Sequence, residues 1–141
     1  MTILFICAGN VARSQIAEAI FNNLSKGKGV AISAGTKVVK ENSTGEGQKI
    51  KDKDINIVKV MDEIGIDVSD HRRKQLTPKM FNYAEEIIVI NPSENIPEYV
   101  KQSSKVTFWE VPDPLNQNLD FARTTRNQLQ ILVSNLISAI S

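Results

Sequence analysis

The sequence predicts a single α/β domain in which a mainly parallel sheet carries helices on both faces. Two continuous apolar runs, Thr2–Cys7 and Glu86–Ile90, have the pattern of strands that are buried on both sides. Helical patterns lie between the strand patterns, and such alternation implies crossover connections and a parallel sheet. The chain has 141 residues and no internal repeat, so we expect one domain over residues 1–141.

The elements of the first half follow in chain order from hydrophobic periodicity. Residues Ser14–Leu24 repeat apolar side chains at three- and four-residue spacing, which predicts an amphipathic helix after the first strand. Val30–Ala34 is a weaker strand pattern. Asp54–Ile64 is a second helical pattern, and Gly65 is placed to end it.

The second half continues the alternation of helices and strands. Short helices are predicted near Thr77–Tyr83 and Ile96–Lys101, on either side of the strand Glu86–Ile90. Val106–Val111 predicts a fourth, weaker strand. Apolar residues from Leu119 to Ile140 follow one helix face, which predicts a long closing helix that covers the sheet.

The stretch Lys37–Asn56 interrupts this pattern. It contains five lysines, a turn-rich centre and little apolar content. A connection of that length without structure has a function of its own or is mobile. The simplest interpretation is a solvated, flexible insertion.

Composition argues against several classes of protein. The 17 basic and 16 acidic side chains leave a net charge of +1, without the basic excess that nucleic-acid binders use. One cysteine and one histidine provide no ligand cluster for zinc, so we expect no metal and no cofactor. No apolar run is long enough for a membrane span, so we expect no membrane partner and a cytoplasmic location, where a lone thiol stays reduced.

The segment Cys7–Ser14 joins the first strand to the first helix. Backbone amides at a helix N-terminus lack helical partners and lie at the positive end of the dipole, which favours an anion there. Small residues let the backbone close around the anion, and Asn10 tolerates a left-handed conformation. We predict that a tetrahedral oxyanion binds to six consecutive residues: Ala8, Gly9, Asn10, Val11, Ala12 and Arg13.

Cys7 is the predicted nucleophile at the floor of this loop. Amide dipoles and a nearby arginine stabilise a thiolate, which is the reactive form of cysteine. Arg13 can place two donors on two oxygens of the bound anion. Ser14 can cap the helix, or it can donate its hydroxyl proton to the sulfur and ease the departure of the thiolate.

Asp113 is a candidate proton donor at the same edge of the sheet. It follows the last predicted strand, and the carboxyl ends of parallel strands meet at the sheet edge where ligands bind. Pro114 favours an extended conformation at Asp113. By itself, however, an Asp-Pro pair is more often a turn than a catalytic motif.

The stretch from Ile3 to Glu18 resembles the signature of the low-molecular-weight protein tyrosine phosphatases and of the arsenate reductases that share their fold. Further matches cover nearly the whole chain in order and spacing: Ser33–Thr36, Gly65–Arg72 and Val111–Pro114. The resemblance implies a four-stranded parallel sheet of strand order 2-1-3-4. It places a phosphate loop, residues 8–13, after the first strand.

The resemblance also implies a function and its supporting residues. It implies a cysteine-dependent phosphomonoester hydrolase that acts on a phosphorylated protein, chiefly at phosphotyrosine, or on a small aryl phosphate. The site should bind inorganic phosphate and arsenate as well. Similarity to the family's Asp-Pro loop implies that Asp113 is the general acid, which protonates the leaving oxygen and then, as a carboxylate, deprotonates the water that hydrolyses the phosphocysteine. Ser33 and His71 stand in shared motifs, which implies that they support the loops around the site. Where the phosphatases commonly carry tyrosines and a second cysteine, this chain has Leu115-Asn116 and Ala12.

Two alternatives remain open at this point. Arsenate reduction is favoured by Trp109–Pro114 and Ser14-Gln15, but with Cys7 as the only cysteine it needs an external low-molecular-weight thiol. The other alternative is a non-catalytic module that binds an oxyanion or a phosphopeptide. Five basic residues could attract such a partner or merely form solvated surface: Lys26, Lys28, Arg72, Arg73 and Lys74.

Overall fold

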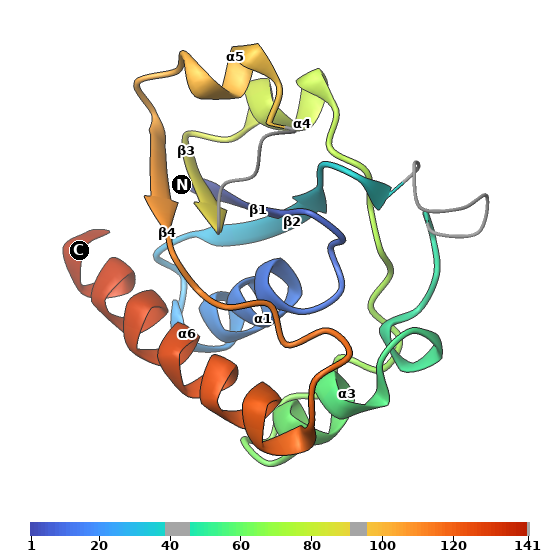
Figure 1. Ribbon diagram of the computed structural model, residues 1–141. Coiled ribbons are helices and arrows are strands. Elements are labelled where there is room, and N and C mark those ends of the chain that lie inside the picture. The colour runs from blue at the N-terminus through green and yellow to red at the C-terminus, as the bar shows by residue number, and fades with distance from the viewer. Residues whose placement is uncertain (39–45, 91–95, 141) are drawn as a thin grey trace.

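Four parallel strands form the centre of the molecule in a computed structural model that describes residues 1–38, 46–90 and 96–140. The strands pair in the order β2-β1-β3-β4 (Figure 1). Their bounds are β1 (Thr2–Cys7), β2 (Val30–Gly35), β3 (Glu86–Ile90) and β4 (Val106–Trp109). Each neighbouring pair is parallel, so the predicted α/β fold and its strand order are confirmed.

Helices cover both faces of this sheet, as the sequence predicted. Their bounds are α1 (Arg13–Leu24), the 3₁₀ helix η1 (Ile50–Asp52), α3 (Ile55–Asp62), α4 (Pro78–Tyr83), α5 (Glu98–Lys101) and α6 (Leu119–Ile140). One hydrophobic cluster joins the sheet to α1, α3 and α6, and a second joins the opposite face to α4 and α5. Figure 1 shows α4 and α5 on one side of the sheet and α1 with α6 on the other.

The central strand β1 explains the continuous apolar run at the start of the chain. Ile3 and Phe5 pack into the cluster with α1 and α6, whereas Leu4 and Ile6 pack into the cluster with α4 and α5. All four side chains are fully buried. A strand with covered faces on both sides needs apolar residues at every position, which fixes the end of β1 firmly in the core.

Several predicted boundaries differ from the structure by one or two residues, and two of these differences have a clear physical cause. The strand expected over Val106–Val111 ends at Trp109. β4 is an edge strand whose middle residues are exposed, and Pro112 lacks the amide hydrogen that further pairing would use. Asp54 precedes α3 rather than starting it, because its side chain accepts a hydrogen bond from the Asn56 amide at 3.1 Å as an N-cap.

In the connection Lys37–Asn56, residues 39–45 lie outside the described part of the chain. The expectation of a flexible insertion is wrong for residues 46–56. The Gly47 amide donates to the Arg73 carbonyl at 2.8 Å, and the Arg73 amide donates to the Gln48 carbonyl at 2.9 Å. Ile50 is fully buried in the larger hydrophobic cluster, so this one apolar residue anchors the segment to the core.

No helix in the described ranges combines the length and the apolar composition that crossing a membrane requires.

A partly exposed carboxylate, Glu63, holds α6 against α3. Arg123 donates to it from Nη2 at 2.7 Å, and Arg126 donates from Nη1 at 2.5 Å. Arg126 also donates to the Val60 carbonyl at 2.8 Å. The hydrogen bond from Arg123, followed by that from Arg126, lowers the pKa of Glu63 from 4.5 to about 2.

Replacing Glu63 with glutamine should lower the free energy of unfolding at neutral pH. The folded-state pKa lies below the unfolded value, so the ionised form stabilises the fold fully above pH 4.5 and loses that contribution as the pH falls towards about 2. Urea unfolding of both proteins at neutral pH and near about pH 3 measures the difference, which should shrink in acid. The control is Glu98→Gln, which changes an exposed helix-surface pair with Lys101. A difference that stayed constant with pH would contradict this account.

Candidate active site

The site lies at the carboxyl edge of the sheet, where β1 ends at Cys7. β1 lies between β2 and β3. After β1 the chain adds β2 on one side of it, and it then crosses to the other side to add β3. Ligands of open α/β sheets bind at such a switch point. The phosphate loop, residues 8–13, leaves the strand here and leads directly into α1.

Neighbouring segments hold the first carbonyl groups of this loop by hydrogen bonds. The carbonyl oxygens of residues 7–9 accept hydrogen bonds from the amides of Thr36 and Lys37 and from Nε of Arg73, at 3.0, 2.9 and 3.0 Å. A trans peptide points its N–H opposite to its C=O, and the described residues contain no cis peptide. The amides of residues 8–10 therefore point away from these partners, which supports the predicted amide cradle.

A cleft of about 70 Å³ opens over the loop. Its lining brings the predicted nucleophile, arginine and acid together: Cys7, Ala8, Gly9, Val11, Ala12, Arg13, Asp113 and Leu115. Of the predicted oxyanion-binding residues, Asn10 is the one whose side chain does not line the cleft. Leu115 was not predicted as a site residue, and its apolar side chain adds one wall beside Asp113.

Ser14 contacts the nucleophile directly. The Cys7 sulfur lies 2.9 Å from the Ser14 hydroxyl oxygen, and that oxygen accepts a hydrogen bond from Asn10 Nδ2 at 2.8 Å. The hydroxyl proton is then available for the sulfur. The N-cap of α1 is Ala12, so the alternative in which Ser14 caps the helix is wrong.

Arg13 is almost fully buried and links the loop to Asp113. Its Nη1 donates to the Val111 carbonyl at 3.4 Å, and its Nη2 lies 3.4 Å from Asp113 Oδ2. Its Nε is buried and has no hydrogen-bond partner among the described residues. A buried donor without a partner is destabilising, and an oxyanion oxygen in the cleft would satisfy it.

The chain after β4 carries Asp113 into the cleft on a loop held at both ends. Gln128 Nε2 donates to the Glu110 carbonyl at 3.1 Å, and Asn56 Nδ2 donates to the Gln117 carbonyl at 3.4 Å. Asp113 is half-exposed, and its Oδ1 accepts from the Leu115 amide at 3.0 Å. Its carboxyl group can therefore reach both a ligand and water.

A second carboxylate lies near Asp113. Burial raises the pKa of Asp54, and the negative charge of Asp113 raises it further. Among the residues that the structure describes, no group of three His, Cys, Asp or Glu side chains is placed to hold a metal ion.

Asn10 braces the loop from behind. Its φ of 52° is in the left-handed region, which asparagine tolerates better than most residues other than glycine. Its Nδ2 donates to Ser14 and, at 3.0 Å, to the Ser33 hydroxyl, and its Oδ1 accepts from Gln15 Nε2 at 3.0 Å and the Lys74 amide at 2.8 Å. Ser33 therefore touches the loop through Asn10 rather than through the cleft.

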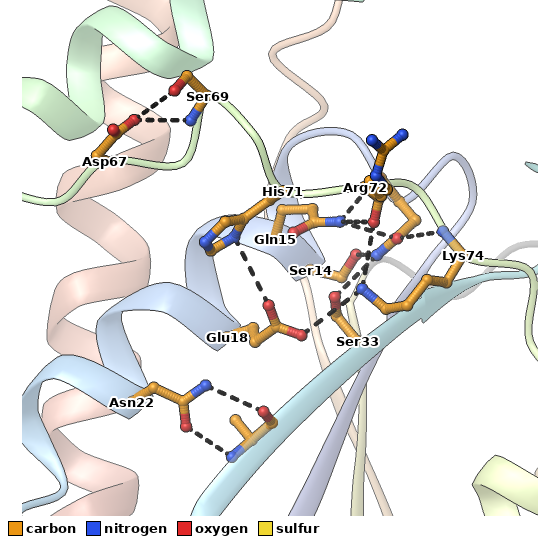
Figure 2. A network of polar contacts seen from close by, with 12 residues as sticks. Ser14, Gln15, Glu18, Asn22, Ser33, Asp67, Ser69, His71, Arg72 and Lys74 are labelled. Carbon is orange, nitrogen blue, oxygen red and sulfur yellow. Dashed lines mark hydrogen bonds and ion pairs between the residues drawn. The ribbon is translucent and has the colours of Figure 1, made fainter. Parts of the chain in front are cut away.

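His71 does not line the cleft. Its Nδ1 lies 3.8 Å from Glu18 Oε2, and Lys74 Nζ lies 3.8 Å from Glu18 Oε1. Figure 2 shows Gln15 and Glu18 projecting from α1 towards the segment that carries these residues. The arrangement is consistent with the supporting role expected for His71.

Two buried residues behind the loop were not predicted from the sequence. Gln15 and Arg73 are fully buried, although Arg73 had been grouped with the basic surface residues. That expectation is wrong for Arg73, because its guanidinium lies between the phosphate loop and residues 47–48. An arginine in a basic run looks the same in the sequence whether it is buried or solvated.

Replacing Gly35 with alanine should disturb the loop from below. A Cβ at Gly35 would lie 2.6 Å from the Ala8 carbonyl oxygen and 2.9 Å from the Asn10 amide nitrogen. We expect a loss of about 1–3 kcal/mol in the free energy of unfolding, as for other overpacked sites, together with weaker binding of inorganic phosphate. Denaturant unfolding and calorimetry measure the two effects.

Gly27→Ala is the matched control for Gly35→Ala. Gly27 has a φ of 87° and nothing within 4 Å of an added Cβ, so its substitution strains the backbone without touching the loop. It should lower stability and leave phosphate binding unchanged. Equal phosphate affinity in both variants would show that the loop tolerates the added methyl group.

Comparison with known proteins places this geometry in context. The chain matches the family described as low molecular weight phosphotyrosine protein phosphatase over residues 2–141. It is similar to a protein of Synechocystis sp. named glutaredoxin arsenate reductase, with 31% identity over 99% of this chain and 98% of that protein. It is also similar to a protein of Ralstonia solanacearum named "Probable low molecular weight protein-tyrosine-phosphatase", with 34% identity over 74% of this chain and 65% of that protein.

A solved structure agrees over the whole chain. The low molecular weight protein tyrosine phosphatase from T. tengcongensis superposes with a TM-score of 0.83 and 30% identity, covering 99% of both chains.

Proposed function

Because the chain belongs to the low molecular weight phosphotyrosine protein phosphatase family, we propose that it hydrolyses phosphotyrosine in proteins and small aryl phosphates through a phosphocysteine intermediate. The observation that carries this proposal is that Cys7, Arg13 and Asp113 line one small cleft. A cytoplasmic location, where the thiol stays reduced, remains a prediction.

In the first step the Cys7 thiolate attacks phosphorus and the bond to the leaving oxygen breaks. Arg13 and the loop amides bind the non-bridging oxygens, where charge is held in the transition state. Asp113 donates its proton to the departing oxygen. Leu115 offers an apolar contact for the aromatic ring of the leaving group.

In the second step water attacks the phosphocysteine and the bond between sulfur and phosphorus breaks. Asp113, now ionised, takes a proton from the water. The Ser14 hydroxyl, 2.9 Å from the sulfur, stabilises the departing thiolate. Inorganic phosphate leaves, and the cleft returns to its starting state.

The direct test is hydrolysis of para-nitrophenyl phosphate and of a phosphotyrosine peptide by the purified protein from about pH 4 to about pH 8. A phosphoserine peptide of the same sequence is the control for the aryl leaving group. Release of phosphate from the aryl substrates alone is expected. No release from any of them would overturn the proposal, and retained phosphate binding would then indicate a binding module.

Arsenate reduction is the second candidate, since the Synechocystis relative carries that name. Here the Cys7 thiolate would attack arsenate and form a sulfur–arsenic bond with loss of water. An external thiol would then attack the sulfur, and the sulfur–arsenic bond would break with its electron pair on arsenic, releasing arsenite and leaving a mixed disulfide. A second external thiol would restore Cys7 and form the external disulfide, so two thiols supply the two electrons. Arsenate-dependent consumption of glutathione, measured with and without the protein, tests this route.

A further inference from the structure

The segment of residues 72–74 lies against the back of the phosphate loop. The Arg72 carbonyl accepts a hydrogen bond from Gln15 Nε2 at 2.9 Å, next to the start of α1 (Figure 2). The Lys74 amide donates to the Asn10 side chain. Between these two backbone contacts, Arg73 reaches the loop with its side chain.

Arg73 contacts the loop at one carbonyl. Its Nε donates to the Gly9 carbonyl oxygen at 3.0 Å, across 64 residues of sequence. Its Nη1 donates to Gln48 Oε1 at 2.9 Å, and its own backbone pairs with residues 47 and 48. The side chain is fully buried, so the guanidinium has a fixed position rather than a solvated range of rotamers.

The Gly9 carbonyl belongs to the peptide that carries the Asn10 amide. The two groups point in opposite directions, so holding the carbonyl against Arg73 turns the amide towards the cleft side of the loop. Asn10 is in the left-handed conformation, which needs support from its surroundings in a residue other than glycine. Arg73 supplies part of that support through the Gly9 carbonyl, and the hydrogen bonds of the Asn10 side chain supply the rest.

We propose that Arg73 is a positioning residue that orients the Asn10 amide for oxyanion binding, a role that rests on the proposed phosphatase function. A charged donor on the carbonyl also polarises the peptide, which strengthens its amide as a hydrogen-bond donor. Arg73 therefore acts on the bound phosphoryl group through the Gly9–Asn10 peptide, without touching the substrate.

The experiment compares Arg73→Met and Arg73→Lys with the wild type. Direct calorimetry of inorganic phosphate binding reports on the cradle without requiring turnover. Steady-state kinetics on para-nitrophenyl phosphate give kcat and KM, and thermal unfolding gives stability. Arg123→Met is the matched control, since it removes an arginine that clamps α6 at Glu63 and lies outside the cleft lining.

For Arg73→Met we expect about a 100-fold loss of kcat/KM, the scale on which a misplaced catalytic group lowers rate. Phosphate affinity should fall about tenfold, as for the loss of one hydrogen bond of about 1.4 kcal/mol. Arg73→Lys retains one donor and should fall between this variant and the wild type. Arg123→Met should lower thermal stability with wild-type phosphate affinity.

A folded Arg73→Met protein with kcat and phosphate affinity within about twofold of the wild type would overturn the proposal. If that variant does not fold, Arg73→Lys decides: lower phosphate affinity supports the role, and unchanged affinity rejects it. A wild type that binds phosphate but hydrolyses nothing would refute the phosphatase function while the phosphate comparison still tests Arg73. A wild type that does not bind phosphate would reject both.

Discussion

Replacing Cys7 with serine is expected to lower kcat by roughly 10⁵- to 10⁶-fold, the scale seen when a covalent enzyme loses its nucleophile. A serine hydroxyl needs a base to remove its proton, and the cleft lining contains a single carboxylate, Asp113, which has to act as the acid. The loop amides and Arg13 remain, so the variant should still bind inorganic phosphate. Rates with para-nitrophenyl phosphate and calorimetry with phosphate measure the two properties.

Ser14→Ala is the graded control for this result. It removes the hydroxyl that lies 2.9 Å from the sulfur while the sulfur stays in place. We expect a partial loss, on the order of 10- to 100-fold, comparable with the loss of other groups that support a reactive ligand. A Cys7→Ser protein that kept more activity than Ser14→Ala would rule out attack by Cys7.

Replacing Asp113 with asparagine is expected to lower kcat by about 10²- to 10⁴-fold, the usual contribution of a general acid. Asparagine keeps the size of the side chain and cannot give a proton to the leaving oxygen. The loss should be largest for phenyl phosphate, whose leaving group needs the proton, and smallest for para-nitrophenyl phosphate. The measurement is kcat for both proteins across a series of substituted phenyl phosphates.

Asp54→Asn provides a control at a neighbouring carboxylate. Asparagine is as good an N-cap as aspartate, so the start of α3 should be preserved. Since Asp54 does not line the cleft, kcat should stay within about twofold of the wild type across the substrate series. An Asp113→Asn protein whose loss was equal for good and poor leaving groups would show that Asp113 acts by holding Arg13 rather than by donating a proton.

The parts of the site that could be predicted are those that depend on local pattern. The apolar run predicts the strand β1, and the small residues after Cys7 predict the loop. The spacing of apolar residues then predicts the helix α1. The carboxyl ends of parallel strands share one edge, which placed Asp113 near the loop, but its role as the acid was predicted only with the resemblance to the family's Asp-Pro loop.

The parts that could not be predicted depend on contacts between distant segments. Nothing near Arg73 in the sequence indicates that Gly9 and Gln48 will surround its side chain. Ile50 stands among lysines, so this segment has no apolar periodicity that would predict η1. Leu115 reaches the cleft only because the loop after β4 turns back on itself, with Asn116 at a φ of 63°.

The contacts of residues 72–74 also set an order of assembly for the newly made chain. A ribosome that has released the first 60 residues has already supplied Cys7, Arg13 and all of α1. It has not yet supplied Arg73, which donates to the Gly9 carbonyl, or Lys74, whose amide donates to the Asn10 side chain. The nascent protein therefore contains its reactive thiol before the loop around it is fully braced, and catalytic competence should appear only after the middle of the chain has folded against the beginning.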